Sequence, residues 1–319
     1  MKSLAIWLDE NSIAPQNDSI EMHVNLWKIA TKKNGYRRFI DIGINLLDPQ
    51  TLNRLRIYVP VKLEANNVFD IVGSFINDNS LICTLFNENY RSIHKPNSKA
   101  HSIHDNSGSF KFDIYELDQS NFHLEHRYNG TIINVMISNT SPTYIRCRID
   151  NTFCDQIVNI QRPSNSFFQS AFSKIEITDF RVNDVRDLNN SLLEEMNKEK
   201  IPQISKGHFF YMISSNEEVI NYQIPFINCR ILEKQKWLKY IGENSLKQDE
   251  EVLAYHWKIS NNNFNIFVKT KFENNNWKTI LWYLFVLLLL TILFDRISDY
   301  INHSLDNALT YASYIIHKT

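Results

Sequence analysis

The sequence predicts a mainly β fold, α+β overall, in which a sandwich- or barrel-like cytoplasmic region precedes a C-terminal transmembrane α-helix and an amphipathic tail helix. Three observations predict this class. Short runs with period-two alternation fill most of the first 275 residues. An uncharged apolar run follows at 280–294, and apolar residues then recur at spacings of three and four.

The strands come first along the chain. Asn34 and Gly35 stand between the first two candidate strands and indicate a hairpin turn. The density of short strands is typical of a sandwich or barrel. The predicted strands cover 20–30, 37–47, 55–63, 80–86, 109–117, 130–138, 143–149 and 174–182.

Two further parts are expected after the first strands. Pro163 marks the boundary between a β-rich domain at 1–162 and a second α+β part at 163–275. The second part contains two helix candidates and ends in a hairpin around an asparagine-rich turn. The helices are expected within 187–200 and 230–242, the hairpin strands at 251–260 and 264–272, and a long polar connection at 87–109.

Composition excludes several classes of function. Only seven glycines occur, and their spacing leaves no dinucleotide-binding, phosphate-loop or nucleophile-elbow motif. No standard catalytic signature is found, so we expect no enzyme and no cofactor. Four scattered cysteines fit reduced thiols, and the apolar run at the N-terminus is too short for a signal-peptide core. A net charge of -1 makes any anion recognition local.

The apolar segment at 277–294 is expected to cross a membrane once. Eighteen helical residues rise about 27 Å, close to the ~30 Å of a bilayer core. Trp277 and Lys278 fit the membrane boundary, and Thr291 lies inside the span. Three lysines precede the span closely, whereas Arg296 alone follows it, which favours a cytoplasmic N-terminal domain. The alternative is a buried core helix or an oligomer helix.

The tail at 295–319 carries a second helical pattern. An apolar stripe begins at Ile297, and another face holds Asp295, Asp299, Asn302 and Asp306. In an oligomer these residues would form stacked rings at a pore mouth, a feature that selects cations. The alternative is a helix that lies on the bilayer with its polar face in water.

Two strands of the soluble part share an Arg-Arg-Tyr pattern. Period-two alternation places each set on one face of a sheet, where guanidiniums suit phosphates and the ring suits a stacked base. A basic loop would add to this surface. The ordinary alternative is a solvated face with charge pairs. The predicted ligand-binding residues are Arg54, Arg56 and Tyr58, then Tyr144, Arg146 and Arg148, and, in the loop, Lys32, Lys33, Arg37 and Arg38.

The histidine and aspartate clusters do not predict a metal site. His123 and His126 would point to opposite faces of a strand, and His101 and His104 stand in the polar connection. The acidic cluster around Asp184 is interpreted as an ion-paired loop.

In layout the chain resembles the membrane effectors of bacterial anti-phage systems, in which a soluble sensor is joined to a membrane span. The resemblance implies a ligand-gated oligomeric ion channel in the bacterial inner membrane, controlled by a nucleotide or oligonucleotide that a partner enzyme supplies. Membrane lipid and further copies of the chain would be its partners. The alternatives are a tail-anchored adaptor that binds a protein and a membrane-tethered enzyme.

Overall fold

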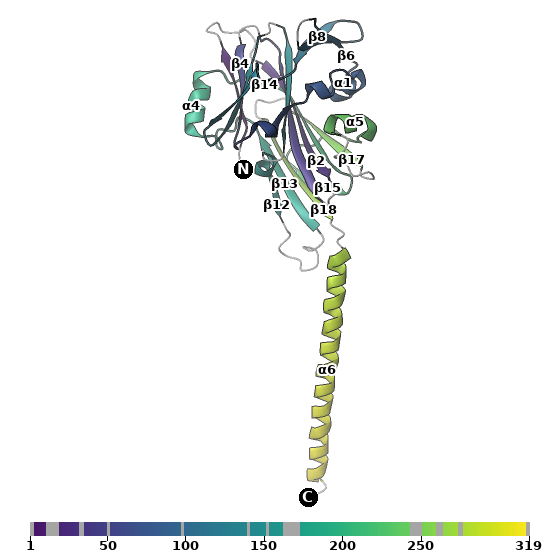
Figure 1. Cartoon of the computed structure of the whole chain (residues 1–319). Coiled ribbons are helices and arrows are strands. Elements are labelled where there is room, and N and C mark those ends of the chain that lie inside the picture. The colour runs from purple at the N-terminus through teal and green to yellow at the C-terminus, as the bar shows by residue number, and fades with distance from the viewer. Residues whose placement is uncertain are drawn as a thin grey trace. The chain divides into compact units, whose positions relative to one another are not determined.

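The computed structural model divides the chain into two compact units (Figure 1). One unit comprises Met1–Gln161 and Ile175–Phe272, and the other comprises Arg162–Lys174 and Glu273–Thr319. The structure describes residues 3–10, 19–31, 35–49, 52–96, 99–138, 141–150, 153–161, 173–242, 251–259, 264–273 and 277–316.

A ten-stranded sheet forms the middle of the first unit. Its centre joins the two halves of the chain, because β14 runs parallel to β2 while β2 and β3 form the predicted hairpin. The strand order is β16 (Asn228–Ile231), β17 (Val252–Ile259), β14 (Gln203–Ser214), β2 (Ser19–Ala30), β3 (Tyr36–Leu46), β11 (Thr143–Asp150), β8 (Phe110–Tyr115), β7 (Ala100–His104) and β6 (Arg91–His94), and β5 (Val68–Asp70) also pairs with β11.

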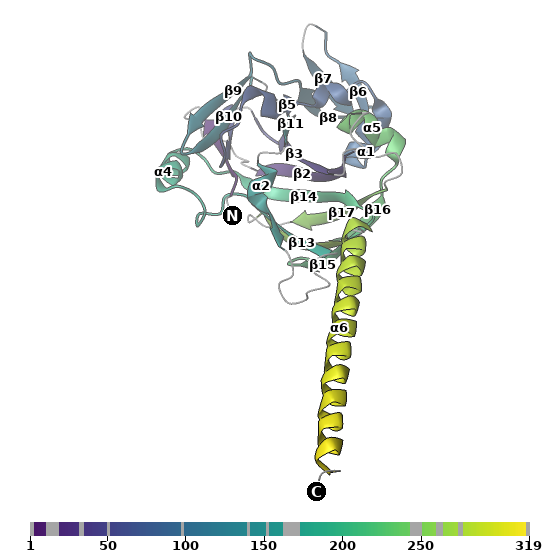
Figure 2. The same ribbon diagram turned by 60° about the horizontal axis from the view of Figure 1, so that its bottom comes forward.

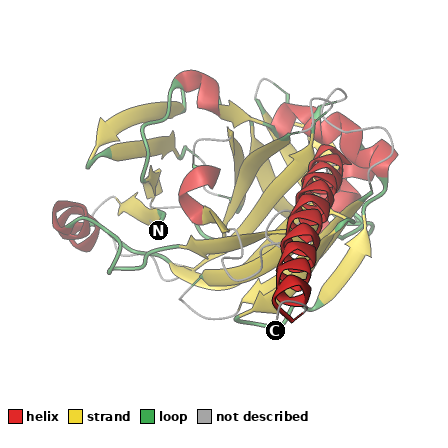
Figure 3. Ribbon diagram, turned by 90° about the horizontal axis from the view of Figure 1, so that it is seen from below, coloured by secondary structure: helices red, strands yellow, loops and turns green. Residues whose placement is uncertain are grey.

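Two four-stranded sheets accompany it, and strands make up most of this unit (Figure 3). The first has the order β1 (Ala5–Glu10), β4 (Leu52–Val59), β10 (Gly130–Met136) and β9 (Phe122–Arg127). The second has the order β12 (Val158–Gln161), β13 (Ser173–Arg181), β18 (Asn265–Glu273) and β15 (Glu217–Tyr222). The mainly β prediction is confirmed.

The segments on either side of residue 162 share these sheets. β12 pairs with β13 across that point, so the chain does not divide there into the two predicted parts. The expected final hairpin is also wrong. β17 pairs with β14 and β16 in the ten-stranded sheet, whereas β18 lies in the second four-stranded sheet.

Short helices cover parts of the sheets: α1 (Asn79–Phe86), α2 (Cys154–Ile157), α4 (Asn190–Lys198) and α5 (Lys234–Ile241), with single turns η1 (Ala65–Asn67) and η2 (Val72–Ser74). The segment of α1 was expected to be a strand. Asp78 overrides that pattern by capping the helix, since its carboxylate accepts from the Ser80 and Leu81 amides. Figure 2 shows α1 and α5 side by side.

Alternation along the central strands builds two separate cores. Met22, Val24 and Leu26 of β2 face the main core, which also takes side chains from both four-stranded sheets. Trp27, the residue after Leu26, points to the other face and packs in a second core with α1 and α5. A third, smaller core joins α4 to the first four-stranded sheet. The ten-stranded sheet is therefore covered on both faces.

The second unit contains one continuous helix, α6 (Trp277–Ile316), of 40 residues. The two predicted segments at 277–294 and 295–319 thus belong to the same helix as far as residue 316. Between Ile280 and Leu309 it reaches a mean hydropathy of 2.2, and none of this stretch is buried. The helix is long and apolar enough to cross a membrane.

A buried ion cluster connects β2 with the second four-stranded sheet. The Lys28 ammonium lies 2.9 Å from Glu176 and 2.8 Å from Glu217, and all three side chains are buried. The rings of Tyr36 and Phe272 approach the same ammonium at 4.5 and 4.2 Å. Arg38 lies 2.5 Å from Glu176, so Lys28 and Arg38 together neutralise two carboxylates that have left water.

Replacing this lysine is expected to destabilise the fold strongly. Lys28→Met leaves the buried Glu217 without its cation and leaves Glu176 with Arg38 alone, and the free energy of unfolding should fall by about 3–5 kcal/mol at pH 8. Burial raises the pKa of the Glu217 carboxyl to about 7, so in the folded state it takes up a proton as the pH falls through 7. The loss should therefore be smaller at pH 6.

Guanidinium unfolding of the full chain in detergent, followed by tryptophan fluorescence, measures both values. Lys62→Met, at an exposed position, is the matched control and should change stability by less than about 0.5 kcal/mol. Equal losses in the two variants would contradict the role of the cluster.

Candidate functional site

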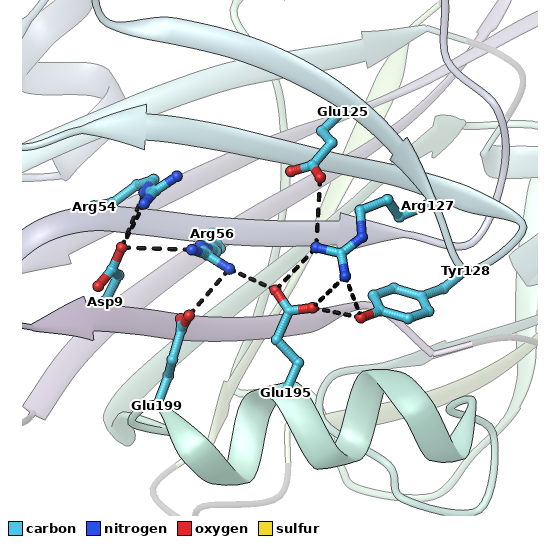
Figure 4. A network of polar contacts seen from close by, with 8 residues as sticks. All are labelled: Asp9, Arg54, Arg56, Glu125, Arg127, Tyr128, Glu195 and Glu199. Atoms are coloured by element: carbon cyan, nitrogen blue, oxygen red, sulfur yellow. Dashed lines mark hydrogen bonds and ion pairs between the residues drawn. The ribbon is translucent and has the colours of Figure 1, made fainter.

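The first predicted arginine set lies on β4 of the first four-stranded sheet. The predicted alternation is confirmed there, because Leu55 and Ile57 face the main core while Tyr58 belongs to the core under α4. Arg54 and Arg56 point to this same α4 side, where they meet carboxylates of the protein itself (Figure 4).

The carboxylates around these arginines are close. Arg54 lies 2.6 Å from Asp9, and Arg56 lies 2.5 Å from Glu195 and 3.1 Å from Glu199 (Figure 4). The Tyr58 hydroxyl donates to the Tyr128 carbonyl at 2.8 Å. Around Arg54 and Arg56, the geometry therefore fits a sheet face with charge pairs better than it fits an open surface that binds phosphate.

The second arginine set lies on a different sheet. Tyr144, Arg146 and Arg148 stand on β11 of the ten-stranded sheet, with exposed fractions of 1%, 1% and 6%. Their alternation is also confirmed, since Ile145 and Cys147 face the main core. The two sets therefore form no common surface.

The two arginines of the basic loop that the structure describes form ion pairs with the protein's own carboxylates. Arg37 pairs with Asp150 at 2.9 Å, and Arg38 pairs with Glu176 of the buried ion cluster. Lys32 and Lys33 lie outside the described residues.

Arg146 and Tyr144 instead line a cavity of about 300 Å³. It lies over the face of the ten-stranded sheet that carries α1 and α5, and we call it the sheet cavity. Its lining comprises Glu21, His23, Asn25, Trp27, Asn45, Thr84, Leu85, Phe86, Asn87, Glu88, Tyr90, Phe112, Tyr144, Arg146, Lys206, His208, Phe210, Met212, Asn228, Arg230, Leu232, Trp237, Ala254 and His256.

Asp41 organises the charges beneath this cavity. Its carboxylate accepts from Arg148 Nε at 2.6 Å and Nη2 at 3.1 Å, from the Tyr240 hydroxyl at 2.8 Å and from Trp27 Nε1 at 3.0 Å. Arg146 comes no closer to it than 4.0 Å. Two buried guanidiniums thus share one carboxylate, and Arg146 is the one that borders the cavity.

Three histidines cross the cavity wall on neighbouring strands. His23 of β2 lies opposite His208 of β14, with ring centroids 5.2 Å apart. His208 Nδ1 lies 2.8 Å from Nε2 of His256 on β17. Burial is the main cause that lowers the pKa of His208 and of His256 to about 4, and burial lowers the pKa of His23 well below its usual range. All three rings are neutral at pH 7.

Gly43 makes room for the floor of the cavity. It lies opposite both His23 on β2 and Arg146 on β11. A Cβ at this position would overlap the Tyr144 hydroxyl and lie 3.1 Å from Arg146 Nη1. The absence of a side chain on Gly43 therefore allows Tyr144 and Arg146 to occupy the middle of the sheet.

The cavity residues on β2 and β14 were missed from the sequence. Glu21, His23 and Asn25 alternate with apolar neighbours in the same period-two pattern that identified the arginines. The alternation is visible in the sequence. The sequence does not reveal that β2 pairs with β14, which comes from the other half of the chain.

The predicted pore residues lie on α6. Thr291, Asp295, Asp299, Asn302 and Asp306 are all exposed in the single chain. Thr291 Oγ1 donates to the Leu287 carbonyl at 3.0 Å, which satisfies its hydroxyl within the helix. The side chains of Trp277 and Lys278 lie outside the described part of the structure.

Among the described residues, no group of three or more histidine, cysteine or acidic side chains could hold a metal ion. No protein-family model matches the sequence, and a search of curated proteins finds no match. Function is therefore argued from the cavity and from α6.

Filling the position of Gly43 should disturb the cavity floor. Gly43→Ala forces Tyr144 and Arg146 to move, and we expect a loss of about 1–3 kcal/mol in the free energy of unfolding. Gly73→Ala is the matched control, because its nearest neighbour would lie 4.0 Å away. Unfolding titrations of both variants measure this, and a stable Gly43→Ala protein would contradict the close packing.

Proposed function

We propose that the chain is a ligand-gated oligomeric membrane effector, of the kind that bacterial anti-phage systems use. In this proposal the sheet cavity binds a small nucleotide-like anion on the cytoplasmic side, and α6 of several copies forms an ion pore in the inner membrane. The adaptor and enzyme alternatives serve as outcomes of the test.

The charge balance of the sheet cavity carries the sensor half of the proposal. Arg146 and Arg148 have one carboxylate, Asp41, between them, and Asp41 already accepts four hydrogen bonds. A carboxylate has about four acceptor sites, so little capacity is left for Arg146. A buried charge without a full partner is costly, and an anionic ligand would offset that cost.

The length of α6 supports the membrane half. Its 40 residues rise about 60 Å, whereas a bilayer core is ~30 Å thick. A plain anchor needs only half of this helix. The remaining half carries Asp295, Asp299 and Asp306 within about 40° of one another around the helix, since each residue turns ~100°. Symmetric copies would bring these carboxylates into rings.

The order of elements links the two halves. His256 of β17 lines the sheet cavity, β18 follows β17, and three residues, 274–276, separate β18 from α6. Coupling of ligand binding at β17 to α6 is part of the proposal, and the flux measurement tests it.

Ion flux through reconstituted protein tests the pore. We expect liposomes that contain the full chain to release K⁺ when a ligand occupies the cavity, and we expect cations to pass in preference to chloride. Asp295→Asn, Asp299→Asn and Asp306→Asn together should lower that preference about tenfold, because the rings lose their charge.

Ser304→Ala is the control on the same helix, about 160° away from the acidic stripe. It should leave the ratio of cation to anion permeability unchanged. Ligand binding without flux would overturn the pore and favour the adaptor, and turnover of the ligand would favour a membrane-tethered enzyme.

A further inference from the structure

The floor of the sheet cavity is rich in hydrogen-bond donors. Arg146 donates through Nε to the Tyr240 hydroxyl at 2.8 Å and through Nη1 to the Tyr144 hydroxyl at 2.7 Å. When the side-chain amide of Asn25 is turned so that its oxygen faces Arg146, Nη2 of Arg146 donates to that oxygen at 2.7 Å. A guanidinium has five N–H groups. Two of them are left for an acceptor in the cavity.

His23 adds a further donor. Because the Tyr144 hydroxyl accepts from Arg146, its own proton is directed to His23 Nδ1, which lies 3.4 Å away. A neutral imidazole whose Nδ1 accepts carries its proton on Nε2. Arg146 and His23, which both line the cavity, thus each keep N–H groups that these hydrogen bonds do not use.

Two buried polar atoms in the cavity lining also have no partner among the described residues. They are the donor Trp237 Nε1 and the acceptor Asn45 Oδ1. Buried polar groups normally make hydrogen bonds, and leaving one unpaired costs ~1–3 kcal/mol. A ligand with both acceptor and donor groups would satisfy them.

The charges at the cavity decide where the anionic group goes. Glu21 and Glu88 in the lining offset Lys206 and Arg230, and Lys206 lies 3.6 Å from Glu21. These four charges sum to zero. The excess positive charge is that of Arg146, whose side chain is only 1% exposed. An anion therefore gains most at the floor.

Flat rings next to this floor suit an aromatic ligand. Phe210 and His256 stack with ring centroids 4.2 Å apart and planes 9° from parallel. Phe86 and Tyr144 meet edge to face at 5.0 Å in the same lining. A base stacks on such rings with ~1–3 kcal/mol.

The size of the cavity limits the ligand. At about 300 Å³ it is at the lower end of the range of small-molecule sites, ~300–1,000 Å³. One flat ring with one anionic group fills that space, and a dinucleotide or longer oligonucleotide exceeds it.

We propose that the sheet cavity binds a single mononucleotide, with its phosphate against Arg146 and His23 at the floor and its base against Phe210 and His256. This inference rests on the proposed function, because it names the ligand class of the same cavity.

Calorimetric titration of the full chain in detergent tests the ligand class. The probes are the adenosine, guanosine, cytidine and uridine 5′-monophosphates, their 3′,5′-cyclic forms, the free nucleosides, inorganic phosphate and a cyclic dinucleotide. At least one mononucleotide should bind, and at least about tenfold more tightly than its nucleoside, since a charge-assisted hydrogen bond contributes ~1.5–3 kcal/mol. The dinucleotide and phosphate should bind much more weakly. Tighter binding of the dinucleotide, of the nucleoside or of phosphate alone, or binding of no mononucleotide, would overturn the proposal.

Two variants separate recognition from folding. Arg146→Gln should abolish the preference for mononucleotide over nucleoside. Phe210→Leu should weaken both about tenfold and keep the preference, because it removes only stacking. Arg54→Gln, in the network under α4, is the control and should leave both affinities unchanged. An Arg146→Gln protein that keeps the preference, or a Phe210→Leu protein with unchanged affinities, would overturn the assigned positions.

The titration and the flux measurement together distinguish failure of the ligand proposal from failure of the pore proposal. Mononucleotide binding with this variant pattern and no ion flux would support the ligand and overturn the channel. Flux that responds to an oligonucleotide and not to mononucleotides would support the channel and overturn the ligand.

Discussion

The Asp41 carboxylate is the interaction on which the candidate site depends. It lies in the middle of β3, opposite Asn25 on β2 and Arg148 on β11. An ionised carboxylate without partners in this interior would be very unfavourable, so the chain surrounds it with Arg148, Tyr240 and Trp27. Tyr240 belongs to α5. The same group that neutralises Arg148 therefore also fixes the helix that covers the cavity and leaves Arg146 with spare donors.

Much of the fold follows from local patterns that a sequence displays directly. Alternation of apolar and polar residues identifies β4, β10, β11 and six further strands, β2, β3, β8, β13, β17 and β18, because every second side chain must reach the main core. The Asn34-Gly35 signal in the sequence, which predicts the hairpin of β2 and β3, is equally local, and so is the apolar start of α6. In each case the deciding residues are neighbours in the chain.

The errors arise where a cap overrides the local pattern or where a distant partner decides. Segment 80–86 has strand-like residues, yet a single cap, Asp78, and a left-handed Asn87 enclose a helix. β17 and β18 are consecutive strands, but each finds its hydrogen bonds in a different sheet. Arg54 and Arg146 show the same alternation. The two arginines differ in their surroundings. Arg54 pairs with Asp9, whereas Arg146 borders the sheet cavity and is therefore the candidate ligand contact.

The sensor and the pore of the proposed mechanism require their charged side chains to be buried to different degrees. In the sheet cavity, the guanidinium of Arg146 is held away from water, and the free energy of burying it depends on which groups replace that water. On α6, the carboxylates of Asp295 and Asp299 are exposed in a single chain, and their energy depends on whether they meet lipid, water or further copies. A helix that is apolar on one side and acidic on the other favours assembly only where water fills the centre. The acidic stripe is therefore consistent with a water-filled assembly and unfavourable for a lone helix surrounded by lipid.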